Sequence, residues 1–417
     1  MLSRKKSFLL LQGPCSPFSA RLADRLADDG HHVHLLNFNG GDLLYRRRQG
    51  ARLYRGSLPD LPEFLQVLYR RDNITDQVLF GDQRPVHRPA ITLAPAFGVR
   101  TQVLEEGYFR PHWITMEPEG VNARSTLPGN PDWFLEAYAR LGDAPAATPF
   151  NSPFRIRATH DVLFHLAGLA NPALAPHYRN HAPVTAPLEY AAYLKRFSLL
   201  RYYKPRDARR IESLVASSRP YFVLPLQLNG DAQIQHHSPY RDMLEVIDRV
   251  MTSFARRAPG DARLVIKNHP LDMGLVNYAR HIRRKADELA IDGRVIYLES
   301  GDLNRLLPGS RGMVTVNSTA GLVAMEHGCP TLSLGQAIYA LPGLVAGAGL
   351  DAFWQHPEAP DPRLFHAFRQ TLLHTVQLNG GFYCRRGIDL AVAQCSPRLA
   401  ADLSPLEELL QCLPKAA

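Results

Sequence analysis

The chain has 417 residues, of which 45% are hydrophobic and 21% are charged. This is the composition of a soluble globular protein, and the length predicts two domains rather than one. No stretch approaches the roughly 18 apolar residues of a membrane span, and the apolar run FLLL at residues 8–11 is too short for a secretory signal. The five cysteines are widely spaced and form no CxxC pair, which argues against a disulfide framework and a structural zinc site and fits a reducing cytoplasm.

The net charge of +9 favours anionic partners without naming one. The densest basic segment is YRRRQGARLYRG, whose arginines are Arg46, Arg47, Arg48, Arg52 and Arg55. An anionic membrane surface, an anionic small substrate and an ordinary solvated face are all compatible with this segment. Nucleic acid is not an expected partner, because the chain carries no RNA-binding signature, zinc finger or basic patch interleaved with aromatic residues.

The first part of the chain reads as a β-α-β unit. SFLLLQ predicts a strand, and residues 16–30 predict a helix with Ser16 as N-cap, Pro17 at the first helical position and Gly30 as the stop. HHVHLLNF predicts the second strand, and ITDQVLFGD and RTQVLEEG continue the alternation. The proline-punctuated stretch at 130–215 reads as a helical linker.

A second alternating set of strands and helices begins near residue 221. Its expected strands are YFVLPLQL, ARLVIKNHP, RVIYLES, GMVTVNS and PTLSLG, with helices between them. Two such sets predict an α/β fold of the GT-B-like kind, with two facing Rossmann-like domains and an interdomain active-site cleft. The expected domains are 1–190 and 215–385, with 386–417 as a closing C-terminal helix.

Two strand ends carry candidate anion ligands. LVIKNHPLD places His269 and Pro270 where a strand meets the lip of the sheet, the place at which such folds bind ligands. TVNSTAGLVAMEHG ends a strand at Asn317 and opens a helix at Ser318 and Thr319, which is either an ordinary N-cap or an anion site. A histidine and a hydroxyl-capped helix from adjacent strands would hold a phosphate from two sides.

Paired glutamates end another predicted strand. Glu105 and Glu106 precede Gly107, and at least one of them is expected in a cleft, where a carboxylate serves as nucleophile or general base. The alternative is an exposed glutamate beside one that pairs with Arg110. His112 reads equally well as a cleft or a packing residue.

Polar loops after two further strands are candidate substrate contacts. The segment LQLNGDAQIQHH contains two adjacent histidines that cannot face the same way on a strand, which is poor geometry for zinc. The segment NFNGGD at 37–42 is a turn or a cleft loop.

Six segments, in order and without a large gap, resemble the bacterial capsular polysaccharide biosynthesis/export family. They are LQGPCSPF…NFNGGD, LEEGYFRPHWITMEPEGVN, LPLQLNGDAQIQHHSPY, LVIKNHPLD, VTVNSTAGLVAMEHG…LPGL and NGGFY. The resemblance runs from about residue 8 to residue 390 and is strongest to the KpsS/LipB-type β-Kdo transferases. Single pieces such as the His-Pro pair are unspecific, but the ordered set is specific.

The resemblance implies a metal-independent GT-B-like glycosyltransferase without a cofactor. It would move β-Kdo from CMP-Kdo to a (lyso)phosphatidylglycerol acceptor and so begin the poly-Kdo linker of capsule. The implied location is cytoplasmic, peripheral on the inner face of the bacterial inner membrane, with a companion poly-Kdo transferase and the capsule export machinery as further partners. The basic segment at 46–55 would then dock on anionic lipid.

The resemblance also implies roles for individual residues. Related CMP-sugar transferases bind CMP through a His-Pro motif and a Ser/Thr motif, and they carry the catalytic carboxylate in an acidic-acidic-Gly motif. The catalytic candidates here are Glu105, Glu106 and His269, and which glutamate acts stays open. The CMP-sugar candidates are Lys267, His269, Pro270, Asn317, Ser318, Thr319, Gly321, Gln227 and Asp231. The other cleft candidates are Gly13, Asn37, Asn39, Gly40, His112 and Glu117.

A β-linked product from a β-configured donor means retention, and double displacement by a glutamate is the economical mechanism. One alternative is a non-catalytic capsule export or assembly factor on a glycosyltransferase fold. Another is an enzyme for a different nucleotide sugar, with Glu326 near the ribose.

Overall fold

The computed structural model describes residues 5–45, 51–179, 184–228, 234 and 238–413. The chain divides into two compact units. Unit 1 comprises residues 1–128, 136–181 and 369–417, and unit 2 comprises residues 129–135 and 182–368. This division differs from the predicted boundaries, because residues 369–385 were assigned to the second domain and instead return to the first.

Unit 1 is built on one seven-stranded sheet with the order β12-β6-β5-β4-β1-β2-β3. Strands β1 to β5 are parallel, whereas β6 runs antiparallel to both β5 and β12. The strand bounds are β1 Ser7–Leu10, β2 His32–Asn37, β3 Ala51–Leu53, β4 Asp76–Phe80, β5 Arg100–Glu106, β6 Trp113–Pro118 and β12 Gln377–Asn379.

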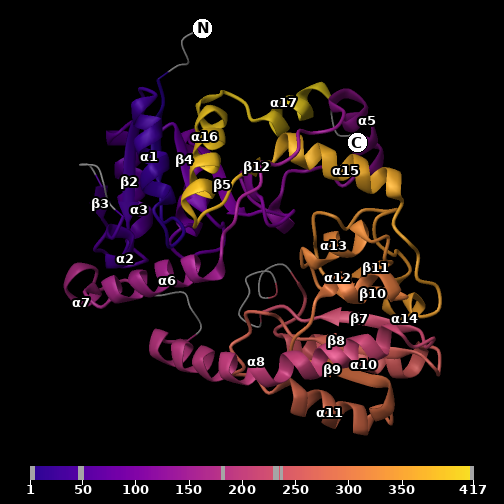
Figure 1. The fold of residues 1–417 in the computed structure, drawn as a ribbon. Helices are drawn as coiled ribbons and strands as arrows, with labels where there is room; N and C mark the ends of the chain where they lie inside the picture. The colour runs from indigo at the N-terminus through magenta and orange to yellow at the C-terminus, as the bar shows by residue number, and fades with distance from the viewer. Residues whose placement is uncertain (1–4, 46–50, 180–183, 229–233, 235–237, 414–417) are drawn as a thin grey trace. The chain divides into compact units, whose positions relative to one another are not determined.

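Helices cover both faces of the unit 1 sheet. On one face α1 (Phe18–Asp28) and α16 (Arg385–Ala400) lie side by side, and their apolar residues pack on Phe8, Leu10 and Leu104 (Figure 1). The other face is covered by α3 (Leu61–Arg71) and α4 (Arg88–Leu93). The remaining helices are α2 Gly40–Leu43, α6 Phe154–Gly168, α7 Asn171–Leu174 and α17 Pro405–Cys412.

Helix α1 begins one residue later than a Ser16 cap predicts. Pro17 occupies the cap position, and the Ser16 hydroxyl accepts a hydrogen bond from the Phe18 N–H at 3.3 Å. The serine therefore still satisfies one of the N–H groups that a helix leaves unpaired at its start.

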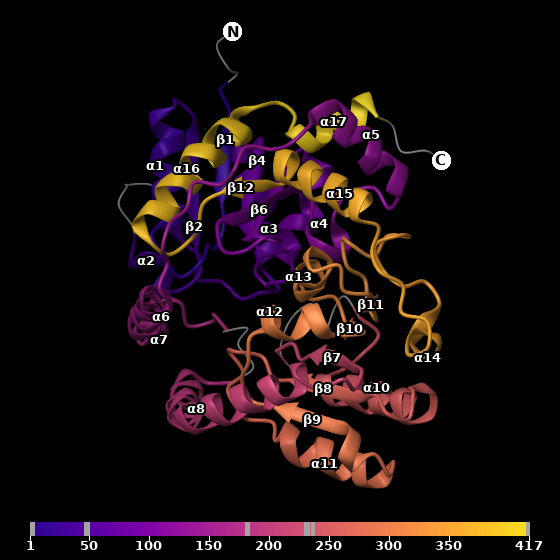
Figure 2. The ribbon, with the colours of Figure 1, turned by 45° about the vertical axis from the view of Figure 1, so that its right-hand side comes forward.

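Unit 2 is built on a parallel five-stranded sheet with the order β11-β10-β7-β8-β9. The strand bounds are β7 Tyr221–Pro225, β8 Arg263–Lys267, β9 Val295–Leu298, β10 Gly312–Thr315 and β11 Thr331–Ser333. Its helices are α8 Ala186–Val215, α10 Met243–Arg257, α11 Tyr278–Glu288, α12 Leu303–Leu306, α13 Ala320–Glu326 and α14 Gly349–Phe353. Helix α8 packs on one face of this sheet, and α10 and α11 pack on the other (Figure 2).

The predicted α/β class is confirmed, since each unit has a mainly parallel sheet between helices. The stretch at 130–215 differs from a linker: it contains α5 (Pro131–Leu141) and the 30-residue helix α8. Helix α15 (Pro362–Thr375) leads the chain back into unit 1. In the part of the chain that the structure describes, no helix is both long and apolar enough to cross a membrane.

Candidate functional site

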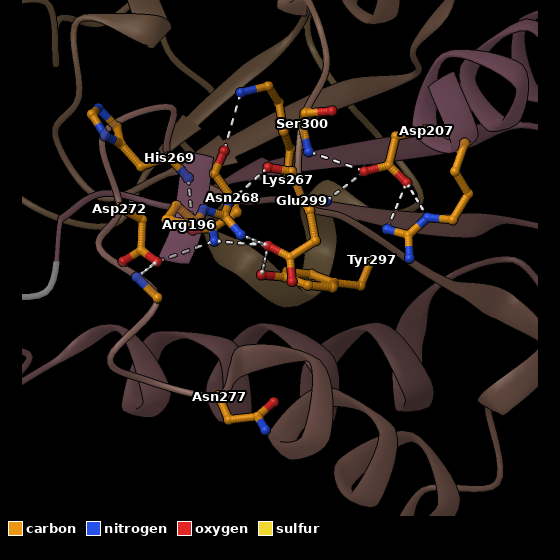
Figure 3. A network of polar contacts seen from close by, with 12 residues as sticks. Arg196, Asp207, Lys267, Asn268, His269, Asp272, Asn277, Tyr297, Glu299 and Ser300 are labelled. Carbon is orange, nitrogen blue, oxygen red and sulfur yellow. Dashed lines mark hydrogen bonds and ion pairs between the residues drawn. The ribbon is translucent and has the colours of Figure 1, made fainter. Parts of the chain in front are cut away.

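The end of β8 fixes the orientation of His269. The Nδ1 atom of its ring accepts a hydrogen bond from the Leu271 N–H at 3.1 Å. The backbone N–H of His269 donates to Oδ1 of Asn268 at 2.8 Å. Because Nδ1 serves as an acceptor, the proton of the neutral ring lies on Nε2. His269 therefore presents a hydrogen-bond donor, and its ring points away from the polar network below it (Figure 3).

That network centres on Glu299, which follows β9 (Figure 3). Its Oε2 atom accepts hydrogen bonds from Arg196 at 2.5 Å, from Asn268 at 3.2 Å and from the Tyr297 hydroxyl at 3.2 Å. Asn268 also donates to Asp272 at 3.3 Å. The residue before His269 is thus held by two carboxylates and is itself buried.

A second contact ties α8 to the same turn. The buried carboxylate of Asp207 accepts from the backbone N–H groups of Glu299 and Ser300 at 2.9 and 3.1 Å, and Arg206 donates to it at 2.8 Å. Charged hydrogen bonds to backbone N–H groups are stronger than neutral ones. Helix α8 therefore positions the loop that follows β9.

Lys267 lies at the end of β8 with only 4% of its surface exposed. Its ammonium donates to the Asn268 carbonyl at 3.1 Å, and burial lowers its pKa to about 8. Among the described residues, no ion pair involves this ammonium. A cavity of ≈ 700 Å³ within unit 2 is lined by Lys267, Pro270 and Gly301 and, from α8, by Phe197, Arg201 and Lys204. Its volume lies in the range typical of small-molecule sites.

The Ser-Thr motif lies one strand further away than predicted. His269 follows β8 and Ser318 follows β10, and β7 lies between them in the sheet, so the two strands are not adjacent. Gln227, after β7, bridges this gap by donating to Oδ1 of Asn317 at 3.0 Å. Two strand spacings are about 10 Å, which matches a nucleotide with its phosphate better than a phosphate alone.

The remaining parts of that motif are packed locally. The Ser318 hydroxyl accepts from the Ala320 N–H at 3.2 Å, and Thr319 occupies the cap position of α13 without a side-chain cap bond. A Cβ atom on Gly321 would lie 2.4 Å from the Tyr339 hydroxyl, so only glycine fits there. Glu326 is exposed at the far end of α13. Asp231 lies outside the described residues, as do Asn229, His236 and His237.

In unit 1, Glu105 and Glu106 end β5 and point to opposite faces of the sheet, because strand side chains alternate. Oε2 of Glu105 accepts from Nδ2 of Asn122 at 2.9 Å. Glu106 lies 3.5 Å from Nη1 of Arg157 in α6. Glu106 thus pairs with Arg157 and not with Arg110, the partner that the sequence analysis offered for one of the two glutamates.

The glycine after the pair is required by the turn into β6. A Cβ atom at Gly107 would lie 2.1 Å from the Trp113 carbonyl oxygen, far inside contact distance. The close approach of these two backbones sets where the strand ends, and hence where Glu106 projects.

Glu117 differs from the prediction that it lines a cleft. Its carboxyl is fully buried on β6, accepts from the Tyr108 hydroxyl at 2.6 Å and from the Ser125 hydroxyl, and has its pKa raised to about 7 by burial. It therefore braces the segment after β6 instead of meeting a ligand. His112 stacks edge-on against Phe150 with ring centroids 5.2 Å apart.

The loop after β2 is also packed inside unit 1. Asn39 caps α2, and the Gly40 N–H donates to Oδ1 of Asn171 at 2.7 Å. A Cβ atom on Gly40 would meet the Ala167 carbonyl at 2.5 Å, and Asn37 is buried. These residues connect the sheet to α6 and α7, which makes them structural in this unit. Gly13 is not part of this loop, and its carbonyl accepts a hydrogen bond from Nη1 of Arg84 at 2.9 Å.

The sequence analysis did not identify Arg196 or the carboxylate of Glu299 as parts of the site. Glu299 ends a predicted strand, so the rule used for His269 would have found it. Arg196 lies inside a long helix with no local signal. Of the basic segment, Arg52 pairs with Asp72 at 3.1 Å and Arg55 donates to the Ala173 carbonyl, whereas Arg46, Arg47 and Arg48 lie outside the described residues.

A family model and two curated relatives are described by capsule polysaccharide biosynthesis, modification or export. Residues 75–383 match a family model described as "Capsule polysaccharide biosynthesis protein". The capsule polysaccharide modification protein LipB of Neisseria meningitidis serogroup B is 38% identical over 92% of this chain and 93% of its own. The capsule polysaccharide export protein KpsS of Escherichia coli is 36% identical over 92% of this chain and 98% of its own. A solved structure of the Thermosulfurimonas dismutans KpsC β-Kdo 2,7 transferase aligns over 94% of this chain and 99% of that one, with 14% identity and a TM-score of 0.45.

Proposed function

Because this chain belongs to the capsule polysaccharide biosynthesis protein family, we propose that it is a glycosyltransferase acting on CMP-Kdo. It transfers one β-Kdo residue to a phosphatidylglycerol-type acceptor and needs neither a metal nor a cofactor. Its relatives are named for capsule modification and export, which supports a role in assembling capsular polysaccharide. Acting on a lipid acceptor would bring it to the inner face of the inner membrane.

The observation that carries this proposal is the end of β8. A histidine whose Nδ1 accepts from the Leu271 N–H follows the same strand as a buried lysine, and that lysine and Pro270 line a cavity large enough for a nucleotide. A phosphate between these two groups would receive both a hydrogen bond and a positive charge. Both stabilise the negative charge that develops on CMP as it leaves.

The catalytic group in this scheme is a glutamate carboxylate. An oxygen of Glu105 or Glu106 attacks the anomeric carbon, and the bond from that carbon to the CMP phosphate breaks. The acceptor hydroxyl then loses its proton and attacks the same carbon, which breaks the ester and restores the glutamate. Two inversions at one carbon give the retained β-configuration.

The test is a transfer assay with purified protein, a fluorescent phosphatidylglycerol analogue and CMP-Kdo made in situ, with the lipid product weighed by mass spectrometry. Wild type should add one Kdo residue. His269→Ala should abolish the addition, and so should one of the two glutamate variants, Glu105→Ala or Glu106→Ala. Arg209→Ala, on the exposed side of α8, is the control. Binding of CMP without transfer to any lipid would instead support an export or assembly factor, the role for which KpsS is named.

A further inference from the structure

The long helix α8 has two sides of different chemistry. One side packs against the rest of unit 2 and carries the buried residues Ala192, Arg196, Asp207, Ile211 and Leu214. The remaining surface between residues 188 and 202 exposes large apolar side chains, namely Leu188, Leu194, Phe197, Leu199 and Tyr202. Leu194 is 74% exposed and Tyr202 is 69% exposed. Because a helix at the surface of a soluble protein normally turns polar residues outward, this apolar surface indicates a binding partner.

The exposed apolar residues of α8 lie together. Leu194 and Tyr202 are eight residues apart, with the exposed Ser198 midway, and helical residues at steps of four lie one above the other on one side. Lys195 and Leu199 are one step apart on the same surface. We call the exposed residues 188–204 of this helix the α8 face.

The α8 face is also positively charged. Residues 190–206 include lysines and arginines and no aspartate or glutamate. Arg196 and Arg206 of this stretch are bound to Glu299 and Asp207. Lys195, Arg201 and Lys204 are exposed, and within the part of the chain that the structure describes no ion pair includes them. Three cations are therefore left to meet an anionic partner.

Apolar and cationic side chains on one helical surface match the interface of an anionic bilayer. Helices that lie in this interface bury leucine and aromatic side chains below the headgroups and keep lysine and arginine at the lipid phosphates. Lysine and arginine suit this position because their methylene stems pack against apolar groups while the charge stays in water. Tyrosine is enriched at the same depth, since its ring is apolar and its hydroxyl is polar.

We propose that the α8 face docks the protein on an anionic phospholipid bilayer, with Leu194 and Tyr202 below the headgroups and Lys195 and Arg201 at the lipid phosphates. The expected docking element was the basic segment 46–55 of the first domain, whereas the α8 face belongs to unit 2. The docking does not depend on the transfer reaction, but its use in reaching a lipid acceptor rests on the proposed function.

The α8 face adjoins the candidate donor cavity. Phe197, Arg201 and Lys204 line the cavity of ≈ 700 Å³ to which Lys267 and Pro270 also contribute. A bilayer held by the α8 face would therefore lie next to this cavity, within the same unit.

Vesicle binding tests the proposal. Purified protein is sedimented with vesicles of phosphatidylethanolamine and phosphatidylglycerol, and with vesicles of phosphatidylcholine alone. The variants are Leu194→Gln, Tyr202→Gln and Lys195→Gln. The matched controls are Val67→Gln, at an exposed apolar position of α3, and Arg256→Gln, at an exposed position of α10.

Wild type should bind the anionic vesicles at least about 10-fold more tightly than the phosphatidylcholine vesicles, because each lysine or arginine near an anionic surface contributes a factor of about 5. Leu194→Gln and Tyr202→Gln should weaken this binding about 10-fold by removing buried apolar area. Lys195→Gln should weaken it about 5-fold. Both controls should bind as wild type, and all variants should keep the wild-type unfolding midpoint because the changed side chains are exposed.

A transfer assay links docking to the reaction. Leu194→Gln should lose activity on an acceptor embedded in vesicles and keep wild-type activity on a soluble short-chain acceptor. If wild type binds vesicles through the α8 face but transfers no Kdo to either acceptor, the proposed function fails and the docking stands.

Three results would overturn the docking. The first is a wild type that does not bind anionic vesicles, or binding that is unchanged in all three α8 variants. The second is loss of binding only in a protein with Arg46, Arg47 and Arg48 all changed to Gln, or only in Leu166→Gln on the exposed side of α6, since the docking surface then lies there. The third is self-association without lipid that the α8 variants abolish, which would make the α8 face an interface between two copies of the chain.

Discussion

Arg196 of α8 and Glu299 after β9 form a buried ion pair in which Nη1 donates to Oε2 at 2.5 Å and Nη2 donates to the Glu299 carbonyl at 3.0 Å. The same Oε2 atom accepts from Asn268, the residue before His269. A residue in the middle of a long helix thus orients the strand end that carries the His-Pro motif.

Removing this arginine should destabilise unit 2. Arg196→Met leaves the Glu299 carboxylate buried without its cation, which costs about 3 kcal/mol of unfolding free energy by analogy with other broken buried pairs. Urea unfolding of Arg196→Met beside Arg209→Met, an exposed arginine of the same helix, measures this. Equal stabilities of the two variants would show that the pair contributes nothing. Arg196→Met with Glu299→Met should recover part of the loss.

Lys267 should make CMP affinity depend on pH. Its pKa is lowered to about 8, so the side chain is a charged ammonium below that pH and loses its proton and its charge above it. The CMP phosphate is already fully ionised above about pH 7, since its second pKa is about 6. Affinity should therefore be constant up to pH 8 and then fall.

Calorimetric titration of CMP across this range provides the measurement. Lys267→Met should bind weakly at every pH and show no fall above pH 8. Lys195→Met, an exposed lysine of α8, should behave as wild type. A fall of the same size in Lys267→Met would assign the pH dependence to another group.

Glu117 should make unfolding depend on pH in the opposite sense from a paired carboxylate. Burial raises its pKa from 4.5 to about 7, so the folded state holds a proton that the unfolded state releases. The resulting stability is fully present below pH 4.5 and is lost as pH rises through 7. Its size is about 3 kcal/mol, at about 1.4 kcal/mol per pKa unit.

Other groups also titrate in this range, so the informative quantity is the difference between wild type and Glu117→Gln. Wild type should lose more stability than the variant between about pH 5 and 8 in urea unfolding. Parallel pH profiles of the two proteins would mean that Glu117 is ionised in the folded state.

Gly107→Ala should damage both folding and transfer. The added Cβ would lie 2.1 Å from the Trp113 carbonyl, so β5 and β6 must separate at the point where Glu106 projects. Such a backbone shift costs about 1–3 kcal/mol, and a misplacement of about 1 Å at a reacting group can cost about 100-fold in rate. Gly129→Ala has open space around it and should be neutral. A fully active Gly107→Ala protein would contradict the assigned role of this turn.

Local sequence patterns predicted the helices and strands, but not which of them pair or pack with one another. The strand before His269 was predictable because a run of β-forming residues stops at Asn-His-Pro, and the fold class followed from alternating strands and helices. The bracing of Asn268 by Glu299 and Arg196 was not, because it joins residues far apart in the sequence. The order of the strands in the sheet could not be predicted either, because the position of β7 between the strands that precede His269 and Ser318 depends on tertiary pairing.

The short strand β12 shows a second limit. Only three residues long, it adds to β6 at the edge of the unit 1 sheet and returns the chain to the first unit. Such a brief segment has no periodicity of its own, so the sequence assigned it to the second domain. Glu117 was misplaced for a related reason, because nothing local indicates that Tyr108 and Ser125 enclose its carboxyl.

Trapping the glycosyl-enzyme tests the proposed transfer most directly. Purified protein is mixed with CMP-Kdo in the absence of a lipid acceptor, quenched in acid, digested and mapped by mass spectrometry. The predicted result is one Kdo residue esterified to the peptide that contains Glu105 and Glu106, present in wild type and absent from one of the two variants Glu105→Gln and Glu106→Gln. Addition of acceptor lipid before the quench should discharge it. Transfer to lipid that proceeds at full rate in both Glu105→Gln and Glu106→Gln, with no labelled peptide in any protein, would contradict both the nucleophile and the double displacement.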